Sequence, residues 1–202
     1  MNRPYIISHM MTSLVGRIDC GMTAKLPGVE EYYAALNKLN LTATLSGRVT
    51  AQLEMAKKGE FEAKNKEPLN AEKFSKKISA KEYSIAVDTK GSLLWQEHSE
   101  VPLIIITSEA VAKEYLAYLD ERNISWIACG KERINLAKAM EILAEEFGVK
   151  RLGIVGGGTI NAGFLNEGLL DEISILLAPG IDGRKGMTAV FDGLPIEKCC
   201  TI

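Results

Sequence analysis

The segment Arg151-Leu-Gly-Ile-Val-Gly-Gly-Gly-Thr-Ile-Asn-Ala-Gly-Phe-Leu165 decides the fold class of this chain. Its apolar run, Leu152 to Val155, predicts a buried strand. Three glycines follow that run, and apolar residues at helical spacing come next (Ile160, Phe164 and Leu165). A strand, a glycine turn and a helix in this order are typical of an α/β protein that binds its ligand where the strand ends.

The glycine turn predicts a site for a phosphate group. Without Cβ atoms the backbone approaches an anion closely, and the free N–H groups in the first turn of a helix point toward it. A tight strand-to-helix turn that binds nothing is the alternative, and the glycines do not follow the spaced G-x-G-x-x-G pattern. The candidate residues are Gly156, Gly157, Gly158 and Thr159, with Asn161 as a further side-chain donor.

Length and composition narrow the class of protein. The 202 residues suit one α/β domain spanning residues 1–202, and 47% of them are hydrophobic, enough for a substantial core. No run reaches the ~20 apolar residues of a membrane span, and the N-terminus has no secretory signal pattern. A net charge of -2 gives no general attraction for nucleic acid or anionic lipid. We therefore expect a cytoplasmic protein with no nucleic-acid partner and no membrane partner.

The cysteines and histidines do not suggest a metal site. The four cysteines include no C-x-x-C pair, and the adjacent Cys199 and Cys200 suit neither an ordinary disulfide nor two ligands of one metal. The histidines are His9 and His98, too few for a multi-histidine metal site. We expect reduced thiols and no bound metal.

Strands and helices alternate along the chain. We predict strands over residues 5–11, 42–45, 83–88, 102–107, 124–129, 152–155 and 171–179, and helices over residues 28–39, 109–122, 135–147 and beyond the glycine turn. The lysine- and glutamate-rich residues 57–81 predict a loop or an irregular helix. Apolar strands alternating with helices predict an α/β fold with a mainly parallel central sheet and helices on both faces. Ligands of such sheets bind at the carboxyl ends of the strands.

Three motifs together resemble a known family. Ser13-Leu-Val-Gly-Arg-Ile18 follows the first strand, Ser46-Gly-Arg-Val-Thr50 follows the second, and Val155-Gly-Gly-Gly-Thr-Ile-Asn161 forms the glycine turn. In this order they resemble the dihydrofolate reductase-like fold, and most closely the pyrimidine reductase of riboflavin biosynthesis, which is the C-terminal domain of a bifunctional deaminase–reductase. Gly168-Leu-Leu-Asp-Glu-Ile173 and Ala178-Pro179 also resemble the ending of that family.

The resemblance implies an NADPH-dependent reductase. That family transfers a hydride from NADPH to a ribosylamino-pyrimidine and opens the ribose to a ribityl chain. The implied substrate is 5-amino-6-(5-phosphoribosylamino)uracil or a related heterocycle. The zinc signature of the deaminase half is missing from this sequence, so the resemblance implies a stand-alone reductase. Similar reductases are commonly dimers, and we expect a homodimer that acts on a small-molecule substrate.

The resemblance also indicates which residues hold the cofactor. Gly47, Arg48 and Thr50 fit the Gly-Arg-x-Thr segment that meets the cofactor in this fold, and Gly156 to Thr159 would hold its pyrophosphate. Arg48 offers a fork for a phosphate, including the 2′-phosphate that separates NADPH from NADH; a plain surface arginine is the alternative. Ser108 falls where the fold contacts the adenosine phosphate, with a helix N-cap as its other role.

The substrate side departs from the family pattern. Val15 stands where the family usually has an aspartate, and Val155 stands where it usually has a glutamate before the glycines. Neither valine can donate, accept or carry charge, yet hydride transfer to a sugar-derived imine needs polar groups. We predict Ser13 and Asp88 as the catalytic residues that contact substrate. The other role of Asp88 is to cap the turn around Lys90-Gly91.

Two other functions fit the same pattern. Loss of the two acids favours a nucleotide-binding protein of this fold without reductase activity. A dihydrofolate or pterin reductase would use an acid on the helix after the first loop, where Glu30 or Glu31 is available. The segment Glu197 to Ile202 has room for one closing strand, whereas the family ends on two. A partner subunit or a missing strand would then account for the sheet edge.

Overall fold

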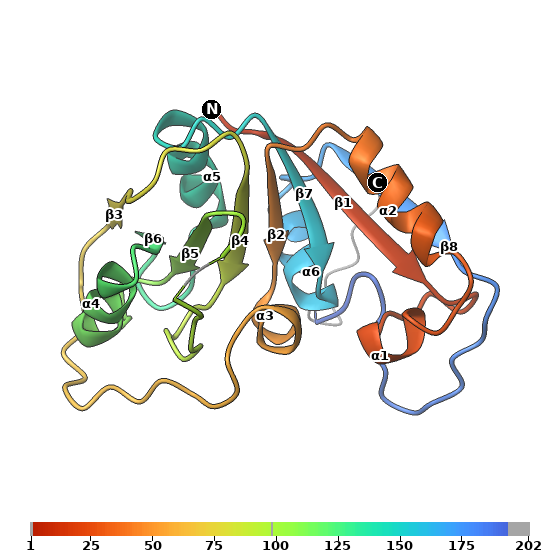
Figure 1. The fold of residues 1–202 in the computed structure, drawn as a ribbon, viewed down its shortest axis with the longest axis horizontal. Helices are drawn as coiled ribbons and strands as arrows, with labels where there is room; N and C mark the ends of the chain where they lie inside the picture. The colour runs from red at the N-terminus through yellow and green to blue at the C-terminus, as the bar shows by residue number, and fades with distance from the viewer. Residues whose placement is uncertain (1, 98, 194–202) are drawn as a thin grey trace.

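The computed structural model describes residues 2–97 and 99–193, whose strands form one eight-stranded sheet (Figure 1). The strands are β1 (Tyr5–Thr12), β2 (Ala43–Ser46), β3 (Lys73–Ser75), β4 (Tyr83–Val87), β5 (Leu103–Thr107), β6 (Ser125–Ala128), β7 (Arg151–Gly156) and β8 (Glu172–Leu177). Their order across the sheet is β3-β6-β5-β4-β2-β7-β1-β8. Neighbouring strands are parallel except β3, which pairs antiparallel with β6. The mainly parallel sheet predicted from the sequence is confirmed.

Helices cover both faces of the sheet, as predicted. The helices of the described residues are α1 (Cys20–Thr23), α2 (Val29–Lys38), α3 (Arg48–Glu54), α4 (Lys113–Glu121), α5 (Leu136–Glu145) and α6 (Gly158–Asn166). One face packs against α5 and α6, and the opposite face packs against α4 and α2. In Figure 1, α2 lies over the β1 and β8 end of the sheet and α4 lies near the β5 and β6 end.

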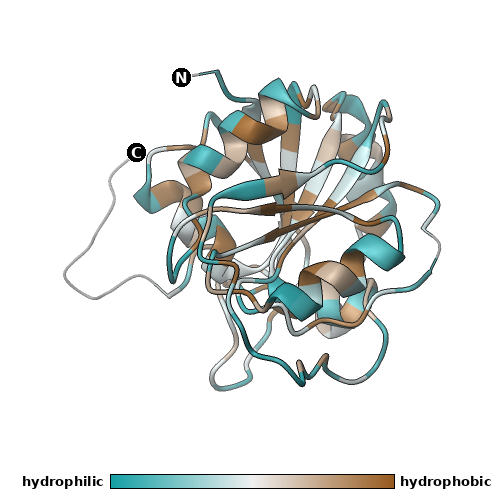
Figure 2. Ribbon diagram, turned by 90° about the vertical axis from the view of Figure 1, so that its left-hand side faces the viewer, coloured by the Kyte–Doolittle hydropathy of each residue, from teal (hydrophilic) through white to brown (hydrophobic). Residues whose placement is uncertain are grey.

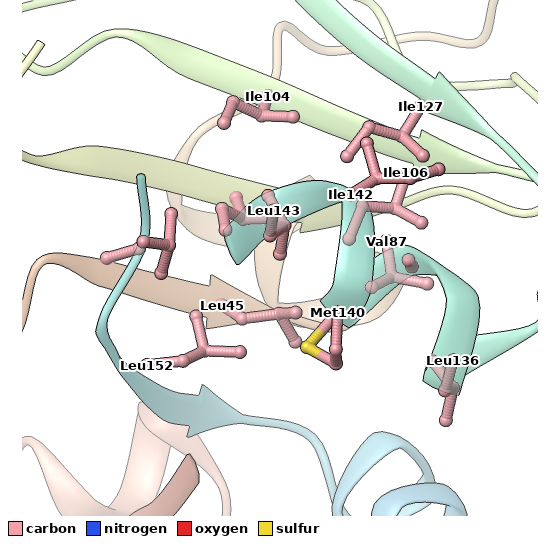
Figure 3. Close-up of a cluster of buried hydrophobic side chains, with 14 of the residues drawn as sticks. Leu45, Val87, Ile104, Ile106, Ile127, Leu136, Met140, Ile142, Leu143 and Leu152 are labelled. Atoms are coloured by element: carbon pink, nitrogen blue, oxygen red, sulfur yellow. The ribbon is translucent and has the colours of Figure 1, made fainter. Parts of the chain in front are cut away.

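The run of isoleucines in β5 shows why the central strands are apolar on both sides. Ile104 and Ile106 join the cluster that packs against α5 (Figure 3). Ile105 points to the opposite face, where it packs with Trp126 and residues of α4. All three isoleucines are completely buried. A parallel strand covered on both faces has no exposed side for polar residues, so its sequence is a continuous apolar run.

Hydrophobic residues are concentrated in the strands, whereas the helices combine hydrophobic and hydrophilic residues (Figure 2). In helix α2 none of the residues is fully buried. The sheet face beneath α2 and α4 is therefore covered well at the α4 end and more thinly toward α2. A groove remains on that face at the amino-terminal ends of β2 and β4.

Two short elements differ from the prediction. Helix α4 begins at Lys113 with Ala112 at its N-cap, so Ser108 is not the N-cap. The reason lies in Glu109, whose N–H donates to the carbonyl of Gly130 at 2.8 Å and whose carboxylate accepts from the N–H of that glycine at 2.9 Å. These bonds hold the chain extended beside β6 before the helix begins. Strand β3 lies in the polar segment predicted as a loop or an irregular helix; it is a strand of three residues at the edge of the sheet, mostly exposed.

The predicted closing strand, Glu197 to Ile202, lies outside the described residues, as do Cys199 and Cys200. Across the part of the chain that is described, no helix combines the length and apolar character needed to cross a bilayer.

Candidate functional site

Two strand-to-helix turns meet at the carboxyl edge of the sheet. Strands β2 and β7 are parallel neighbours, and each runs directly into a helix, α3 and α6 respectively. The N–H of Gly47 donates to the carbonyl of Gly156 at 3.0 Å, so the two turns are joined by their backbones. These joined turns bring together seven sequence-predicted cofactor residues: Gly47, Arg48, Thr50, Gly156, Gly157, Gly158 and Thr159.

The three glycines after β7 are required for different physical reasons. A Cβ on Gly156 would lie 2.5 Å from Cγ2 of Thr50, so the close approach of α3 requires glycine there. A Cβ on Gly158 would fall on the carbonyl oxygen of Ala189. Gly157 has a φ of 97°, a conformation that side-chain-bearing residues rarely adopt. Packing within the chain explains Gly156 and Gly158, which leaves Gly157 and the first N–H groups of α6 as the part of the turn suited to an anion.

Asn161 does not supply the side-chain donor that the sequence suggested. Its amide nitrogen donates to the carbonyl of Val190 at 2.9 Å, and its amide oxygen accepts from the hydroxyl of Ser8 at 3.0 Å. The residue is fully buried and ties β1, α6 and the C-terminal segment together. Thr159, by contrast, is exposed at the start of α6, where its hydroxyl can donate a hydrogen bond to a ligand.

Arg48 lies at the first position of α3 with its side chain 43% exposed. Its Nε donates to the hydroxyl of Ser92 at 3.1 Å, and its Nη2 pairs with the carboxylate of Glu60 at 2.8 Å. An exposed ion pair contributes about 0–1 kcal/mol, so an anion of higher charge displaces such a carboxylate at little cost. The guanidinium of Arg48 is therefore accessible to a phosphate group.

The carboxylate of Asp88 holds the loop that follows β4. The side chain is fully buried, and its Oδ2 accepts hydrogen bonds from the N–H groups of Ser92 at 2.7 Å and Leu93 at 2.8 Å. The hydroxyl of Tyr115 donates to the same oxygen at 3.0 Å. The geometry matches the turn-holding role that was the alternative to substrate contact. A buried carboxylate with these donors already in place is not open to a ligand.

Ser13 and Ser108 also follow strand ends but lie inside the fold. Ser13 follows β1, and its hydroxyl oxygen accepts from the N–H of Arg17 at 3.3 Å. Val15, two residues on, is 53% exposed. Ser108 follows β5, and its hydroxyl donates to the carbonyl of Thr89 at 2.9 Å. The strand order puts Ser13 one strand from the turn after β7, whereas Ser108 is separated from the turn after β2 by β4.

A groove of about 680 Å³ opens on the sheet face between α2 and α3. Its lining includes Thr44 of β2, Thr42 just before that strand, and Ser84 of β4. Thr44 and Ser84 are register partners on adjacent parallel strands, so their side chains lie side by side. Trp95 and Met55 contribute apolar surface to the lining. None of these residues is among the site residues predicted from the sequence.

An ion cluster joins two loops near the end of β1. The guanidinium of Arg184 lies 2.9 Å from the carboxylate of Asp182 and 2.5 Å from that of Asp19. Arg17 donates to the backbone carbonyl of Arg184. Hydrogen bonds from Arg184 lower the pKa of Asp182 to about 2 and hold the pKa of Asp19 below its usual value. Because these charges neutralise one another, the cluster holds the two loops together and leaves little net charge for a ligand.

Two potentially reactive side chains are core residues. His9 stacks on Tyr32 with ring centroids 4.5 Å apart, and burial lowers its pKa. Cys129 is a buried free thiol, and burial raises its pKa to about 12. Within residues 2–97 and 99–193, no group of three or more His, Cys, Asp or Glu side chains is arranged to hold a metal ion.

The chain matches the sequence profile of the RibD C-terminal domain over residues 4–201. It belongs to the RibD C-terminal domain family. This family and the dihydrofolate reductase-like fold are the ones predicted from the motifs at residues 13–18, 46–50 and 155–161, and both predictions are confirmed.

Solved structures extend the comparison of this RibD-family chain. A pyrimidine reductase-like protein from Corynebacterium diphtheriae is 16% identical, with a TM-score of 0.70 over 99% of this chain and 84% of the other. The riboflavin biosynthesis reductase Rib7 of Saccharomyces cerevisiae is 18% identical, with a TM-score of 0.63 over 96% and 81%. RibD of Acinetobacter baumannii is 16% identical, with a TM-score of 0.62 over 98% of this chain but 52% of the other, so the chain spans about half its length. At these identities the likeness establishes the fold.

Proposed function

We propose that this RibD-family protein is a cytoplasmic NADPH-dependent reductase. It would transfer a hydride to a ribosylamino-pyrimidine of the 5-amino-6-(5-phosphoribosylamino)uracil type or to a related small heterocycle. The observation that carries the proposal is the pair of joined turns at the ends of β2 and β7. Family membership supports it, as do the names of two structural neighbours, a pyrimidine reductase-like protein and a riboflavin biosynthesis reductase.

The joined turns fit the phosphates of a dinucleotide. Gly157 and the first turn of α6 present backbone N–H groups without helical partners, and the exposed Thr159 adds a hydroxyl. Arg48 would exchange Glu60 for the 2′-phosphate, and Ser108 would contact the adenosine phosphate. NADPH, when bound, supplies the hydride, while the residues of the chain hold and orient it.

On the substrate side, we propose contact through Ser13 and positioning through Asp88. Ser13 follows the strand beside β7, and among the described residues no group accepts a hydrogen bond from its hydroxyl. Asp88 acts at a distance: the hydroxyl of Ser92 lies 3.4 Å from its Oδ1 and accepts from Arg48 at 3.1 Å. Asp88 would therefore set the position of the arginine that meets the cofactor.

We also propose a homodimer formed through β8. This strand is one edge of the described sheet, and it leaves Ile175 and Leu177 49% and 58% exposed. Apolar side chains on an open strand edge favour cover by another chain. Sedimentation of Leu177→Lys beside the parent protein tests this, and an unchanged dimer would place the interface elsewhere.

A nucleotide-binding protein without reductase activity is the second candidate. Val15 and Val155 favour it, because they remove the two acids expected beside the substrate. Substrate-dependent oxidation of NADPH separates the two functions. Oxidation supports the reductase, whereas tight NADPH binding without turnover on any ribosylamino-pyrimidine supports the binding protein.

The first experiment is a fluorescence titration with NADPH and, in parallel, NADH. We expect tight binding of NADPH and much weaker binding of NADH. Thr159→Glu puts a carboxylate at the N-terminus of α6, where it competes with phosphate but favours the helix, so NADPH affinity falls while thermal stability is maintained. Thr159→Gln is the matched neutral control. Absence of binding for both dinucleotides would overturn the proposal.

A further inference from the structure

After β8 the chain returns across the carboxyl edge of the sheet. Residues 188–192, the crossing segment, lie between the loop after β1 and the start of α6 (Figure 1). On the β1 side, the N–H of Ile18 donates to the carbonyl of Thr188 at 2.9 Å. On the α6 side, the N–H of Asp192 donates to the carbonyl of Gly158 at 3.2 Å. The crossing segment therefore joins the loop after β1 to the helix that begins at the glycine turn.

One carboxylate of the crossing segment lies beside the proposed phosphate site. Cβ of Asp192 is 3.2 Å from the point that a Cβ on Gly158 would occupy, which places this side chain at the first turn of α6. Asp192 is exposed, and no donor or cation among the described residues reaches its carboxylate. A Cβ on the next residue, Gly193, would lie 3.6 Å from Oγ1 of Thr159. The carboxylate of Asp192 and the hydroxyl of Thr159 thus both lie next to the turn proposed to hold the pyrophosphate.

A carboxylate at this place is unfavourable for a bound pyrophosphate unless it contacts another part of the dinucleotide. Two negative groups close together repel each other, whereas a carboxylate accepts hydrogen bonds from the hydroxyl groups of a ribose. A dinucleotide carries one ribose on each side of its pyrophosphate. A carboxylate next to the pyrophosphate site is therefore within reach of a ribose.

The strand order identifies which ribose lies near Asp192. The residues proposed for the adenosine half, Arg48 and Ser108, follow β2 and β5, and both strands lie on one side of β7. Ser13, proposed to contact substrate, follows β1 on the other side of β7. A dinucleotide with its pyrophosphate at the turn after β7 then has its nicotinamide half toward β1, on the side of the crossing segment. The adenosine ribose carries the 2′-phosphate, which a carboxylate would repel, so charge and topology select the same ribose.

We propose that the carboxylate of Asp192 binds the hydroxyl groups of the nicotinamide ribose. Asp192 then contacts a part of the cofactor that NADPH and NADH share, whereas Arg48 contacts the 2′-phosphate that distinguishes them. Because the crossing segment is hydrogen-bonded to the loop after β1, the contact also fixes the nicotinamide half near Ser13. This inference rests on the proposed reductase function, and it adds a cofactor residue that the sequence motifs did not indicate.

Two ligands that differ by one ribose test the contact, 2′-phospho-ADP-ribose and 2′-phospho-ADP. In calorimetry, Asp192→Ala should bind the first ligand about tenfold more weakly or worse than the parent does, and the second no more weakly. NADPH and NADH should both be weakened by a factor similar to that for 2′-phospho-ADP-ribose. Asp192→Asn, which retains one acceptor oxygen, should fall between Asp192→Ala and the parent.

The variants leave the fold intact and have a matched control. The hydrogen bond from Asp192 to Gly158 uses the backbone N–H, so both substitutions retain it, and their thermal melting should match that of the parent. Glu132→Ala is the control. Glu132 is exposed and follows β6 at the same edge of the sheet, but on the far side of β5, β4 and β2 from the glycine turn. This variant should bind all four ligands like the parent.

Three results would overturn the inference. If Asp192→Ala bound both dinucleotides as tightly as the parent, or more tightly, the carboxylate would have no ribose to bind. If 2′-phospho-ADP were weakened as much as 2′-phospho-ADP-ribose, the substitution would act on α6 and not on a ribose. If the parent protein bound neither NADPH nor NADH, the proposed function itself would fail, and the ribose contact with it. Only in this last case is the function at fault, since the first two leave cofactor binding by the parent in place.

Discussion

The substitution Asp88→Asn tests whether the Asp88 carboxylate has a structural role or exchanges protons with the substrate. Oδ2 of Asp88 accepts three hydrogen bonds, from Ser92, Leu93 and Tyr115. An asparagine oxygen placed at the same point would keep all three bonds but lose their charge assistance. Bonds to charged groups contribute about 1.5–3 kcal/mol and neutral ones about 0.5–1.5 kcal/mol. The loss is therefore about 1 kcal/mol per bond and roughly 3 kcal/mol in all.

Urea unfolding followed by tryptophan fluorescence measures this loss. The indole N–H of Trp95 donates to the hydroxyl of Tyr115 at 2.8 Å, and that hydroxyl bonds to Asp88, so the emission of Trp95 reports on this network. A domain of this size shifts its melting temperature by about 2–4 °C per kcal/mol, which predicts a fall of roughly 6–12 °C. Asp120→Asn is the matched control, because the Asp120 carboxylate accepts a hydrogen bond from the indole N–H of Trp126 but is 40% exposed; this variant should lose less than about 1 kcal/mol.

Two outcomes would refute this reasoning for Asp88. Unfolding free energies within about 0.5 kcal/mol of the parent would show that the three hydrogen bonds contribute little. A fall in kcat of about 100-fold or more, measured well below the unfolding transition, would mean that the carboxylate takes part in proton transfer after all. The structural role predicts lost stability with a kcat near that of the parent, together with a modest rise in the Kd for NADPH through Ser92.

Three further perturbations test other parts of the molecule. Gly156→Ala places a Cβ against Thr50 and should cost about 1–3 kcal/mol of unfolding free energy, part of which Thr50→Ala recovers in a urea double-mutant cycle; simple additivity would contradict the contact. Arg48→Gln should raise the Kd for NADPH about 10-fold or more and leave that for NADH unchanged, and an equal effect on both cofactors would remove Arg48 from the 2′-phosphate. The pKa of Asp182 is depressed to about 2 in the folded state, so its stabilising contribution is present above the unfolded pKa and is lost as pH falls toward 2. Urea midpoints measured through that range should fall less steeply in Arg184→Gln, and parallel curves would show that the pair does not stabilise the fold.

The parts of the fold that sequence could predict are those governed by local pattern. The structures of β5 and of the glycine turn after β7 can be predicted from a few adjacent residues. Burial on both faces requires a continuous apolar run in β5, and a positive φ favours glycine in the turn. The motif around Gly47 was equally local. The hydrogen bond between Gly47 and Gly156, however, requires β2 and β7 to be neighbours in the sheet, and no local sequence pattern predicts that pairing.

Residue roles that depend on distant contacts were not predictable in the same way. Ser108 precedes a helical pattern, but the bonds of Glu109 to the end of β6 delay the helix. Gly158 suggested a ligand, yet a side chain at this position would collide with the backbone carbonyl of Ala189. A local signal for the groove does exist in β2, where a threonine or serine alternates with an apolar residue, as is typical of a strand with one polar face. Thr44 on that face lines the groove.

The position of β1 has a consequence for how the chain is made. This strand is synthesised well before its neighbours in the sheet, β7 and β8, which begin at Arg151 and Glu172. At about 5–20 residues per second, roughly ten seconds pass before either partner is synthesised. During that interval the buried isoleucines Ile6 and Ile7 have no sheet to join. Folding yield in the cell should therefore depend on what shields β1 from aggregation until β7 and β8 have been made, and not only on the stability of the finished protein.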